Sequence, residues 1–228
     1  MTPELLAALA AARAEKRSVV LATRLPDGAQ HLWPDAGAEI AAEAAAVLAS
    51  DVARTVQIGN AQWFLQPYAP SRRLVIVGAV HIAQALAPIA ARTGLAVHVV
   101  DPRGAFATSE RFPGVSVSQD WPDEALDALA PDSRTAIVTL THDPKLDDPA
   151  LDRALRSDAA YIGALGSRRT HASRLERLRA LGHDDATLAR IRGPVGLALG
   201  AVTAPEIAVS ILAEIVAARR GAVLAARS

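Results

Sequence analysis

Residues 72–86 read RRLVIVGAVHIAQAL, and the rest of the fold is organised around this stretch. Its apolar run, 74–77, lies between arginine and Gly78, which is typical of a strand buried on both faces of a parallel sheet. Helical spacing of apolar residues follows, and a second apolar run over 95–100 ends at Asp101. A strand, a glycine turn, a helix and a strand that ends in an acid predict the opening of a Rossmann-type fold.

The glycine signature of this opening is altered. The G-x-G-x-x-G/A pattern of dinucleotide-binding turns appears as GAVHIA over 78–83, with Val80 at the second glycine. Because that glycine lets a pyrophosphate approach the backbone, the valine counts against tight binding of an ordinary dinucleotide. His81, near the helix start, could donate to an anion instead. NAD(P) remains an alternative ligand, with Asp101 contacting a ribose hydroxyl.

The chain is predicted to contain two domains. Residues 1–69 read as a small α+β unit, and prolines within 67–70 mark its end. Over 70–228, strands and helices alternate, which predicts an α/β fold: a Rossmann-like parallel sheet with helices on both faces. In this second domain the later elements are expected as strands at 115–117, 135–140 and 159–163, and as helices at 149–156, 184–192 and 207–219.

Composition limits the function. The 228 residues are 51% hydrophobic and carry 24 basic and 24 acidic side chains, so no basic field argues for nucleic acid. The absence of cysteine excludes disulfides, thiolate metal sites and a cysteine nucleophile. The start of the chain resembles no signal peptide, and no apolar run has membrane-spanning length. We therefore expect a cytoplasmic protein without a membrane span.

Polar loops at the carboxyl ends of the strands carry the candidate ligand-binding residues, because open parallel sheets bind ligands there. The segment 163–171, GALGSRRTH, places glycines, a hydroxyl, two guanidiniums and an imidazole at a strand-to-helix turn. Helix N-terminal donors and an arginine fork suit a phosphate. The alternative is a glycine turn followed by a solvated basic helix face that includes Arg174, Arg177 and Arg179. The candidates in this segment are Gly163, Gly166, Ser167, Arg168, Arg169 and His171.

A second polar loop, 141–148, reads THDPKLDD. His142 and Asp143 could contact a ligand, and with Asp147 they could hold a divalent cation. The alternative, that the aspartates cap the next helix, stays open, and no metal ligand is assigned. Asp101 and Arg103 follow the second strand and complete the crevice. No catalytic residue is assigned, since Ser167 has no evident triad and the chain has no G-x-S-x-G elbow.

Six segments closely resemble the XdhC/CoxI family, the accessory proteins of xanthine dehydrogenase and related molybdenum hydroxylases. They are VGAVH at 77–81, DPR at 101–103, TLTHD at 139–143, YIGALGSRRT at 161–170, GPVGL at 193–197 and PEIA at 205–208. The resemblance covers residues 70–220 and implies a Rossmann-like domain. It also implies that the molybdenum cofactor, a molybdopterin carrying a phosphate, is bound in the crevice by the candidates above, by Gly78 and His81, and by Glu206.

Family membership further implies that the chain supports sulfuration of the cofactor and delivers it to apo xanthine dehydrogenase or a related hydroxylase. Such a protein acts as a cofactor-binding chaperone more than as an enzyme with turnover. A cysteine desulfurase is a further partner under this interpretation, and a homodimer stays open. The alternatives are an NAD(P)-binding oxidoreductase, against which the chain has no Tyr-x-x-x-Lys pair, and a chaperone that binds no cofactor.

Two features depart from the family pattern. Residues 1–69 contain no glycine-rich, cysteine-containing segment of the kind that many members carry. Ala198 and Val202 stand where an aspartate and a basic residue are expected. Two charges that would face the ligand are therefore absent.

Overall fold

A computed structural model describes residues 1–222, and the chain divides into two compact units, one spanning Met1–Pro70 and the other beginning at Ser71. The end of the expected second domain, residues 223–228, lies outside the described residues. None of the helices within residues 1–222 combines the length and the apolar character that a bilayer crossing needs.

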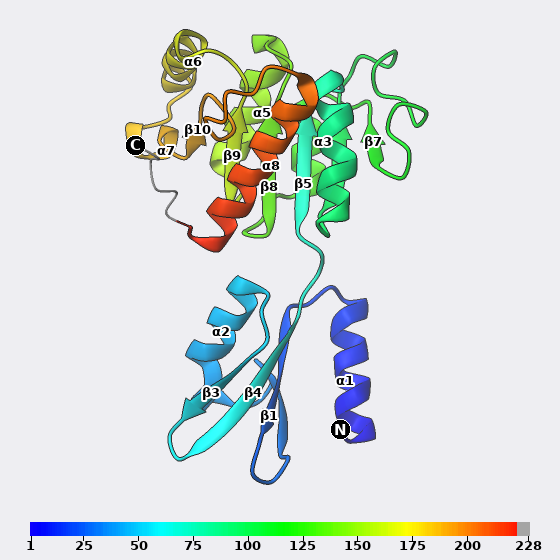
Figure 1. Cartoon of the computed structure of the whole chain (residues 1–228), viewed down its shortest axis with the longest axis vertical. Coiled ribbons are helices and arrows are strands. Elements are labelled where there is room, and N and C mark those ends of the chain that lie inside the picture. Colours follow the sequence, from blue (N-terminus) through cyan, green and yellow to red (C-terminus); the bar gives the residue numbers. More distant parts are fainter. Residues whose placement is uncertain (223–228) are drawn as a thin grey trace. The chain divides into compact units, whose positions relative to one another are not determined.

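The N-terminal unit is a four-stranded antiparallel sheet, in the order β2-β1-β4-β3, with one helix on each face (Figure 1). Strand β1 is buried on both faces: Val20 and Ala22 pack in the core beside α2, and Val19 and Leu21 pack in the core beside α1. The elements are α1 (Pro3–Ala14), β1 (Val19–Arg24), β2 (Gln30–Trp33), the 3₁₀ turn η1 (Ala38–Ile40), α2 (Ala41–Ser50), β3 (Arg54–Ile58) and β4 (Ala61–Tyr68).

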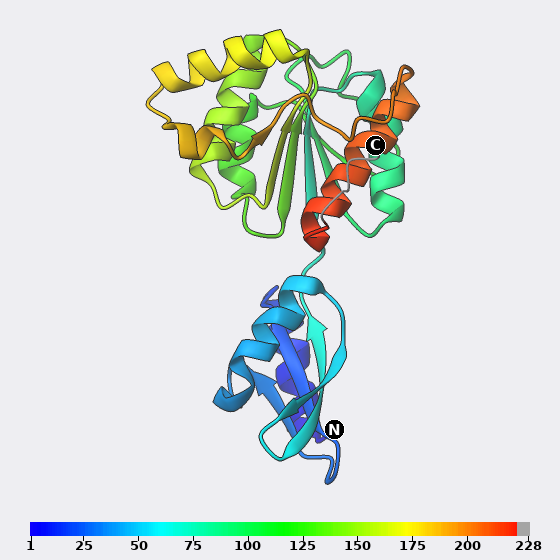
Figure 2. The same cartoon turned by 60° about the vertical axis from the view of Figure 1, so that its left-hand side comes forward.

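The second unit is a six-stranded sheet in the order β10-β9-β8-β5-β6-β7, and every neighbouring pair is parallel. Helices cover both of its faces (Figures 1 and 2), which confirms the predicted Rossmann-like fold. The elements are β5 (Arg73–Val77), α3 (His81–Arg92), β6 (Ala96–Val100), β7 (Ser116–Ser118), α4 (Pro122–Leu129), β8 (Thr135–Thr139), α5 (Pro144–Arg156), β9 (Tyr161–Ala164), α6 (Arg168–Ala180), α7 (Asp185–Leu188), β10 (Ile191–Arg192) and α8 (Ala204–Arg220).

Strand β5 lies at the centre of the sheet, and its two faces contribute to two separate cores. Leu74 and Ile76 pack in a core with residues of α3 and α8, whereas Val75 and Val77 pack in a core with residues of α4, α5 and α6. All four side chains are fully buried, which explains the continuous apolar run. The chain places β6 on one side of β5 and β8 on the other, so the strand order reverses here. Ligands of such sheets bind at this reversal, beyond the carboxyl ends of the strands.

The prediction that a helix begins at residue 149 is wrong, because α5 begins at Pro144 and Pro149 lies inside it. The carboxylate of Asp143 caps the helix by accepting a hydrogen bond from the backbone N–H of Lys145 at 2.9 Å. A proline suits the first helical position, and the sequence offers two prolines that could start this helix. The cap selects the earlier one, so Asp147 and Asp148 belong to the helix.

The predicted helix over 184–192 is also wrong in part. Only Asp185–Leu188 is helical, and Ile191–Arg192 forms β10, which pairs with β9 in parallel. Two residues are too few to carry a strand pattern, so this edge strand depends on the neighbour with which it pairs. In the N-terminal unit, η1 leads directly into α2 and follows Gly37, which has a positive φ of 84°.

We predict that Gly78→Ala destabilises the second unit more than Gly94→Ala does. Both glycines have positive φ, 109° and 84°, so both substitutions carry backbone strain. A Cβ on Gly78 would also lie 2.6 Å from Cγ2 of Thr141, whereas nothing lies within 4 Å of a Cβ on Gly94. Overpacking should add about 1–3 kcal/mol to the cost at Gly78. Hydrogen exchange of the β5 and β8 amides measures the difference, and equal losses would contradict the packing argument.

Candidate ligand-binding site

The carboxyl ends of β5 and β8 meet at the turn that follows β5. The N–H of Gly78 donates to the carbonyl of Val100 at 2.8 Å, and the N–H of Leu140 donates to the carbonyl of Val77 at 2.8 Å. Gly78 packs directly against Thr141, the first residue of the loop after β8. His81 follows as the exposed first residue of α3, and Val80 at its N-cap makes no side-chain capping bond. This helix start therefore keeps N–H groups for an anion.

Asp101 is fully buried, and its carboxylate is saturated by the chain itself. One oxygen accepts from the N–H of Ala79 at 2.8 Å and from Nη2 of Arg103 at 2.7 Å. The other accepts from the backbone N–H and from Nε of Arg103 at 3.0 and 2.9 Å. Burial alone would raise the pKa of Asp101, but these bonds hold the pKa below its ordinary value. The acid thus ties β6 to the glycine turn, and its oxygens do not face a ligand.

The loop after β8 is held by hydrogen bonds that leave His142 exposed. The hydroxyl of Thr141 donates to Oδ1 of Asp147 at 2.7 Å, and Asp143 is the N-cap of α5. His142 lies between them with a φ of 63°, a conformation that is uncommon outside glycine. Within residues 1–222, no group of three or more histidine or acidic side chains could hold a metal ion.

The residues of the predicted phosphate-binding segment, 163–171, have different structural roles in the turn after β9. Gly163 lies inside β9, where a Cβ would come 2.5 Å from Val195, so this glycine serves packing. Gly166 has a φ of 142°, and the hydroxyl of Ser167 caps α6 by accepting from the N–H of Thr170 at 3.1 Å. Arg168 and Arg169 are both exposed in the first turn of α6.

His171 and Glu206 lie outside the pocket that the neighbouring residues form. The ring of His171 packs against Gly193, and its pKa is lowered first by burial and then by the charge of Arg174. Glu206 completes a capping box at the start of α8, where its carboxylate accepts from the N–H groups of Val202 and Thr203 at 2.8 and 2.9 Å. These contacts make Glu206 a structural cap.

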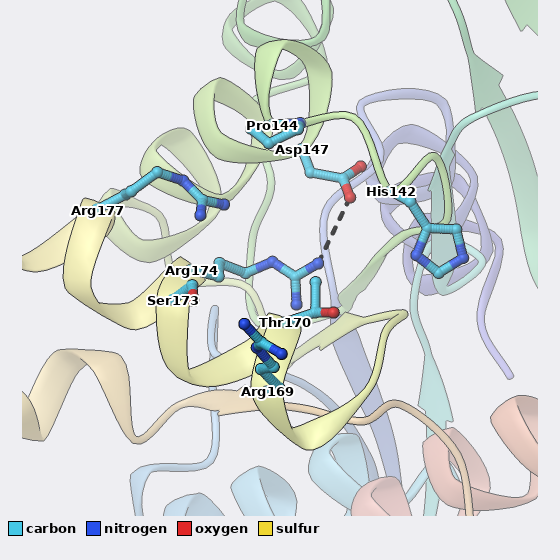
Figure 3. Close-up of a pocket in the computed structure, with 8 residues that line it drawn as sticks. All are labelled: His142, Pro144, Asp147, Arg169, Thr170, Ser173, Arg174 and Arg177. Atoms are coloured by element: carbon cyan, nitrogen blue, oxygen red, sulfur yellow. Dashed lines mark ion pairs between the residues drawn. The ribbon is translucent and has the colours of Figure 1, made fainter.

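A pocket of about 250 Å³ opens between the N-terminal halves of α5 and α6 (Figure 3). Of the predicted site residues, His142 and Arg169 line it together. The remaining lining residues are Pro144, Asp147, Thr170, Ser173, Arg174 and Arg177. The lining residues of α6 occur at positions 170, 173, 174 and 177, which lie on one face of the helix. This helical periodicity is the signal in the sequence that could have identified them.

Arg174 is the buried centre of this pocket, with a side chain only 2% exposed. Its Nη2 donates to the carbonyl of Leu165 at 2.8 Å and lies 3.6 Å from Oδ2 of Asp147. Its Nε and Nη1 have no hydrogen-bond partner within the described part of the chain, and neither has Oδ2 of Asp147. Burial raises the pKa of Asp147, against the opposing effects of the Thr141 hydroxyl and the Arg174 charge. The alternative of a solvated helix face therefore does not hold for Arg174, whose side chain is buried.

A parallel α/β sheet with helices on both faces, and with a basic pocket and an uncapped helix at its carboxyl edge, defines a domain of the Rossmann type. The XdhC Rossmann domain family matches residues 74–215. The chain belongs to this family, which confirms the resemblance seen in the six segments.

Named relatives agree with the family. The molybdenum cofactor insertion chaperone PaoD of Escherichia coli (strain K12) is 35% identical over 160 residues, which are 70% of this chain and 44% of that protein. A probable xanthine dehydrogenase subunit of Bacillus subtilis (strain 168) is 32% identical over 196 residues, 82% of this chain and 54% of that protein. The chain thus spans about half the length of these two relatives.

A solved structure shares the fold. The crystal structure of a xanthine dehydrogenase from Bacillus halodurans aligns with a TM-score of 0.70 at 22% identity, over 96% of this chain and 64% of that chain. At this level of identity, the likeness bears on the fold alone.

We predict that Asp101→Asn destabilises the second unit at neutral pH by about 1.5–3 kcal/mol, because the charged acceptor of the turn is lost. The folded-state pKa of Asp101 is lowered, so its contribution is present above the unfolded pKa of about 3.9 and is lost as the pH falls through the folded value. The gap between variant and wild type should therefore shrink below about pH 4. Urea unfolding at pH 7 and pH 3 measures it, and a constant gap would contradict a role for the charge.

We predict that Arg174→Met destabilises the protein by about 3–5 kcal/mol, because it leaves the buried Asp147 without its cation. The double variant Arg174→Met/Asp147→Leu removes both charges and should cost clearly less than the single variant. Thermal and urea unfolding of the wild type, of the single variants Arg174→Met and Asp147→Leu, and of the double variant measure the coupling. If the double variant lost as much as the sum of the two single variants, the pair would not be coupled.

Proposed function

We propose that the chain binds the molybdenum cofactor at the carboxyl edge of β5 and β8 and delivers it to apo xanthine dehydrogenase or a related molybdenum hydroxylase. Membership of the XdhC family and the relative named as a molybdenum cofactor insertion chaperone support the proposal. One observation of the site carries it. The acid that a dinucleotide would use is saturated within the chain, whereas two donors of the buried Arg174 in α6 have no partner within residues 1–222.

The residues present fit molybdopterin, which carries a phosphate. The uncapped start of α3 with Gly78 and His81, the exposed His142 and the unpaired donors of Arg174 all suit an anionic ligand. Of the other predicted contacts, Asp143, Ser167 and Glu206 would act by capping the helices that border the crevice. Asp101 and Arg103 would hold the glycine turn in place. Binding and release need no catalytic residue, so we propose a chaperone.

The NAD(P) alternative loses its main support. In a dinucleotide fold the acid after the second strand bonds the ribose 2′-hydroxyl. Here both oxygens of Asp101 accept bonds from Ala79 and Arg103, and the side chain is fully buried. Val80 also stands where the pyrophosphate would approach. Both features count against a nicotinamide dinucleotide in the usual position.

Sulfuration of the cofactor would need a second protein. The 228 residues contain no cysteine, so no persulfide can form on them. We propose that a cysteine desulfurase supplies the sulfur while this chain holds the cofactor. The chain would then contribute the binding site, and the sulfur chemistry would take place on the partner.

We expect the protein, purified from cells with an intact molybdenum cofactor pathway, to release pterin on denaturation and oxidation. The double variant His81→Ala/His142→Ala should retain about tenfold less pterin per chain, since two ligand contacts are lost. Arg179→Ala is the control: Arg179 lies at the far end of α6 and pairs with Asp185 on the surface. Its pterin content should match that of the wild type.

The same preparation is assayed for NAD(P)H. Stoichiometric nicotinamide without pterin would contradict the proposal and favour the oxidoreductase. If the purified protein contains neither pterin nor nicotinamide but still binds the apo-hydroxylase, the result would favour a chaperone that acts without cofactor. Activation of the apo-hydroxylase by the loaded chain then tests delivery.

A further inference from the structure

We infer that the pocket between α5 and α6 is a phosphate subsite, with Arg174 as its buried cation and Arg169 and Arg177 at its rim. The inference that the pocket binds an anion does not depend on the identity of the cofactor. The assignment of its phosphate to the molybdenum cofactor rests on the proposed function.

The first argument is the unpaired guanidinium. Folded proteins satisfy nearly all buried donors, yet Nε and Nη1 of Arg174 have no partner within the described residues, although the side chain is only 2% exposed. Figure 3 shows the guanidinium in the centre of the lining side chains, with Asp147 on one side and Thr170 on the other. A phosphate offers several charged acceptor oxygens, which is what a fork of free N–H groups requires.

Asp147 does not replace such a ligand. Its Oδ2 lies 3.6 Å from Nη2 of Arg174, which is beyond hydrogen-bond distance, and its Oδ1 is engaged by the hydroxyl of Thr141 at 2.7 Å. The carboxylate therefore balances the charge of Arg174 in part and leaves its other donors free. Burial also raises the pKa of Asp147, so the group takes up a proton more readily than an exposed aspartate does.

The rim adds positive charge where a helix normally disfavours it. Arg169 lies in the first turn of α6 and forms no ion pair among the described residues, and a cation there opposes the helix dipole unless an anion is present. Arg177 binds Asp148 through Nε at 2.5 Å and Nη2 at 3.0 Å, which fixes its side chain at the pocket. The hydroxyls of Thr170 and Ser173 lie on the same helix face.

The size of the pocket suits a phosphate group and not a whole cofactor. Its volume of about 250 Å³ is below the range of about 300–1,000 Å³ that is typical of sites enclosing a small-molecule ligand. His142 lines the pocket and belongs to the loop that packs against Gly78. The rest of a ligand anchored here would therefore extend past His142 toward the ends of β5 and β8.

Two adjacent arginines give a matched test. Arg168 and Arg169 are both exposed in the first turn of α6, but only Arg169 lines the pocket, so Arg168, a candidate from the sequence, is not part of the subsite. Inorganic phosphate is titrated into the wild type, Arg168→Ala and Arg169→Ala at constant ionic strength, and binding is followed by calorimetry. We expect saturable binding that is about tenfold weaker in Arg169→Ala, and less than twofold weaker in Arg168→Ala.

If phosphate affinity fell equally in Arg168→Ala and Arg169→Ala, the loss would reflect general surface charge, and the proposed subsite would be overturned. Absence of saturable binding by the wild type would overturn it as well. Arg174→Lys tests the buried cation while it preserves a charge beside Asp147. Because a lysine lacks the planar fork, phosphate binding should fall at least as far as in Arg169→Ala. Unchanged binding in a folded Arg174→Lys protein would overturn the role of Arg174.

A second arm identifies the source of the phosphate. The two alanine variants are purified from cells with an intact cofactor pathway, and their pterin is assayed. Loss of pterin in Arg169→Ala alone supports the cofactor as the source. Retained pterin with lost phosphate binding would assign the subsite to another phosphate compound and overturn the assignment to the cofactor. A wild type without pterin would defeat the proposed function, and the phosphate titration would still decide the subsite.

Discussion

The hydrogen bonding of the buried Asp101 carboxylate is the interaction on which the carboxyl edge of the sheet depends. The carboxylate joins the end of β6 to the N–H of Ala79 and accepts hydrogen bonds from the guanidinium of Arg103. These bonds hold the turn after β5 against the end of β6. This placement of the turn brings Gly78 against Thr141 and thereby places the loop after β8. The same bonds occupy the acid that a dinucleotide would need. One carboxylate therefore builds the crevice and removes the usual reason to expect NAD(P) in it.

Helix α6 contributes the opposite kind of group, a buried cation whose donors are not used up. Arg174 is held by the carbonyl of Leu165 and by the charge of Asp147, and two of its nitrogens remain without a partner in the described chain. Asp101 and Arg174 therefore differ at this edge. The buried acid has hydrogen bonds to both oxygens, whereas the buried base has two nitrogens without a partner among the described residues. An edge of this kind has the charge and the free donors that suit an anionic ligand.

Several parts of the fold were predictable because their signals are local. The run 74–77 predicted a two-faced strand, and both of its faces are buried in separate cores. Other parts were not predictable, since neighbours decide them. Two prolines could have started α5, and the cap formed by Asp143 selected the first. Strand β10 has two residues, too few for a pattern, and exists through its pairing with β9.

The sequence by itself determined the α/β class, the family, and the polar loops that follow the strands, because each is encoded in contiguous residues with a fixed period or spacing. It could not determine which polar side chains remain free to bind. Asp101 and Arg174 are both charged residues in polar contexts, and only tertiary packing engages the first completely and the second in part. Burial and hydrogen bonding arise between segments far apart in the chain, such as Ala79 with Asp101 and Asp147 with Arg174. Which polar groups remain free at this edge is therefore a property of the folded structure.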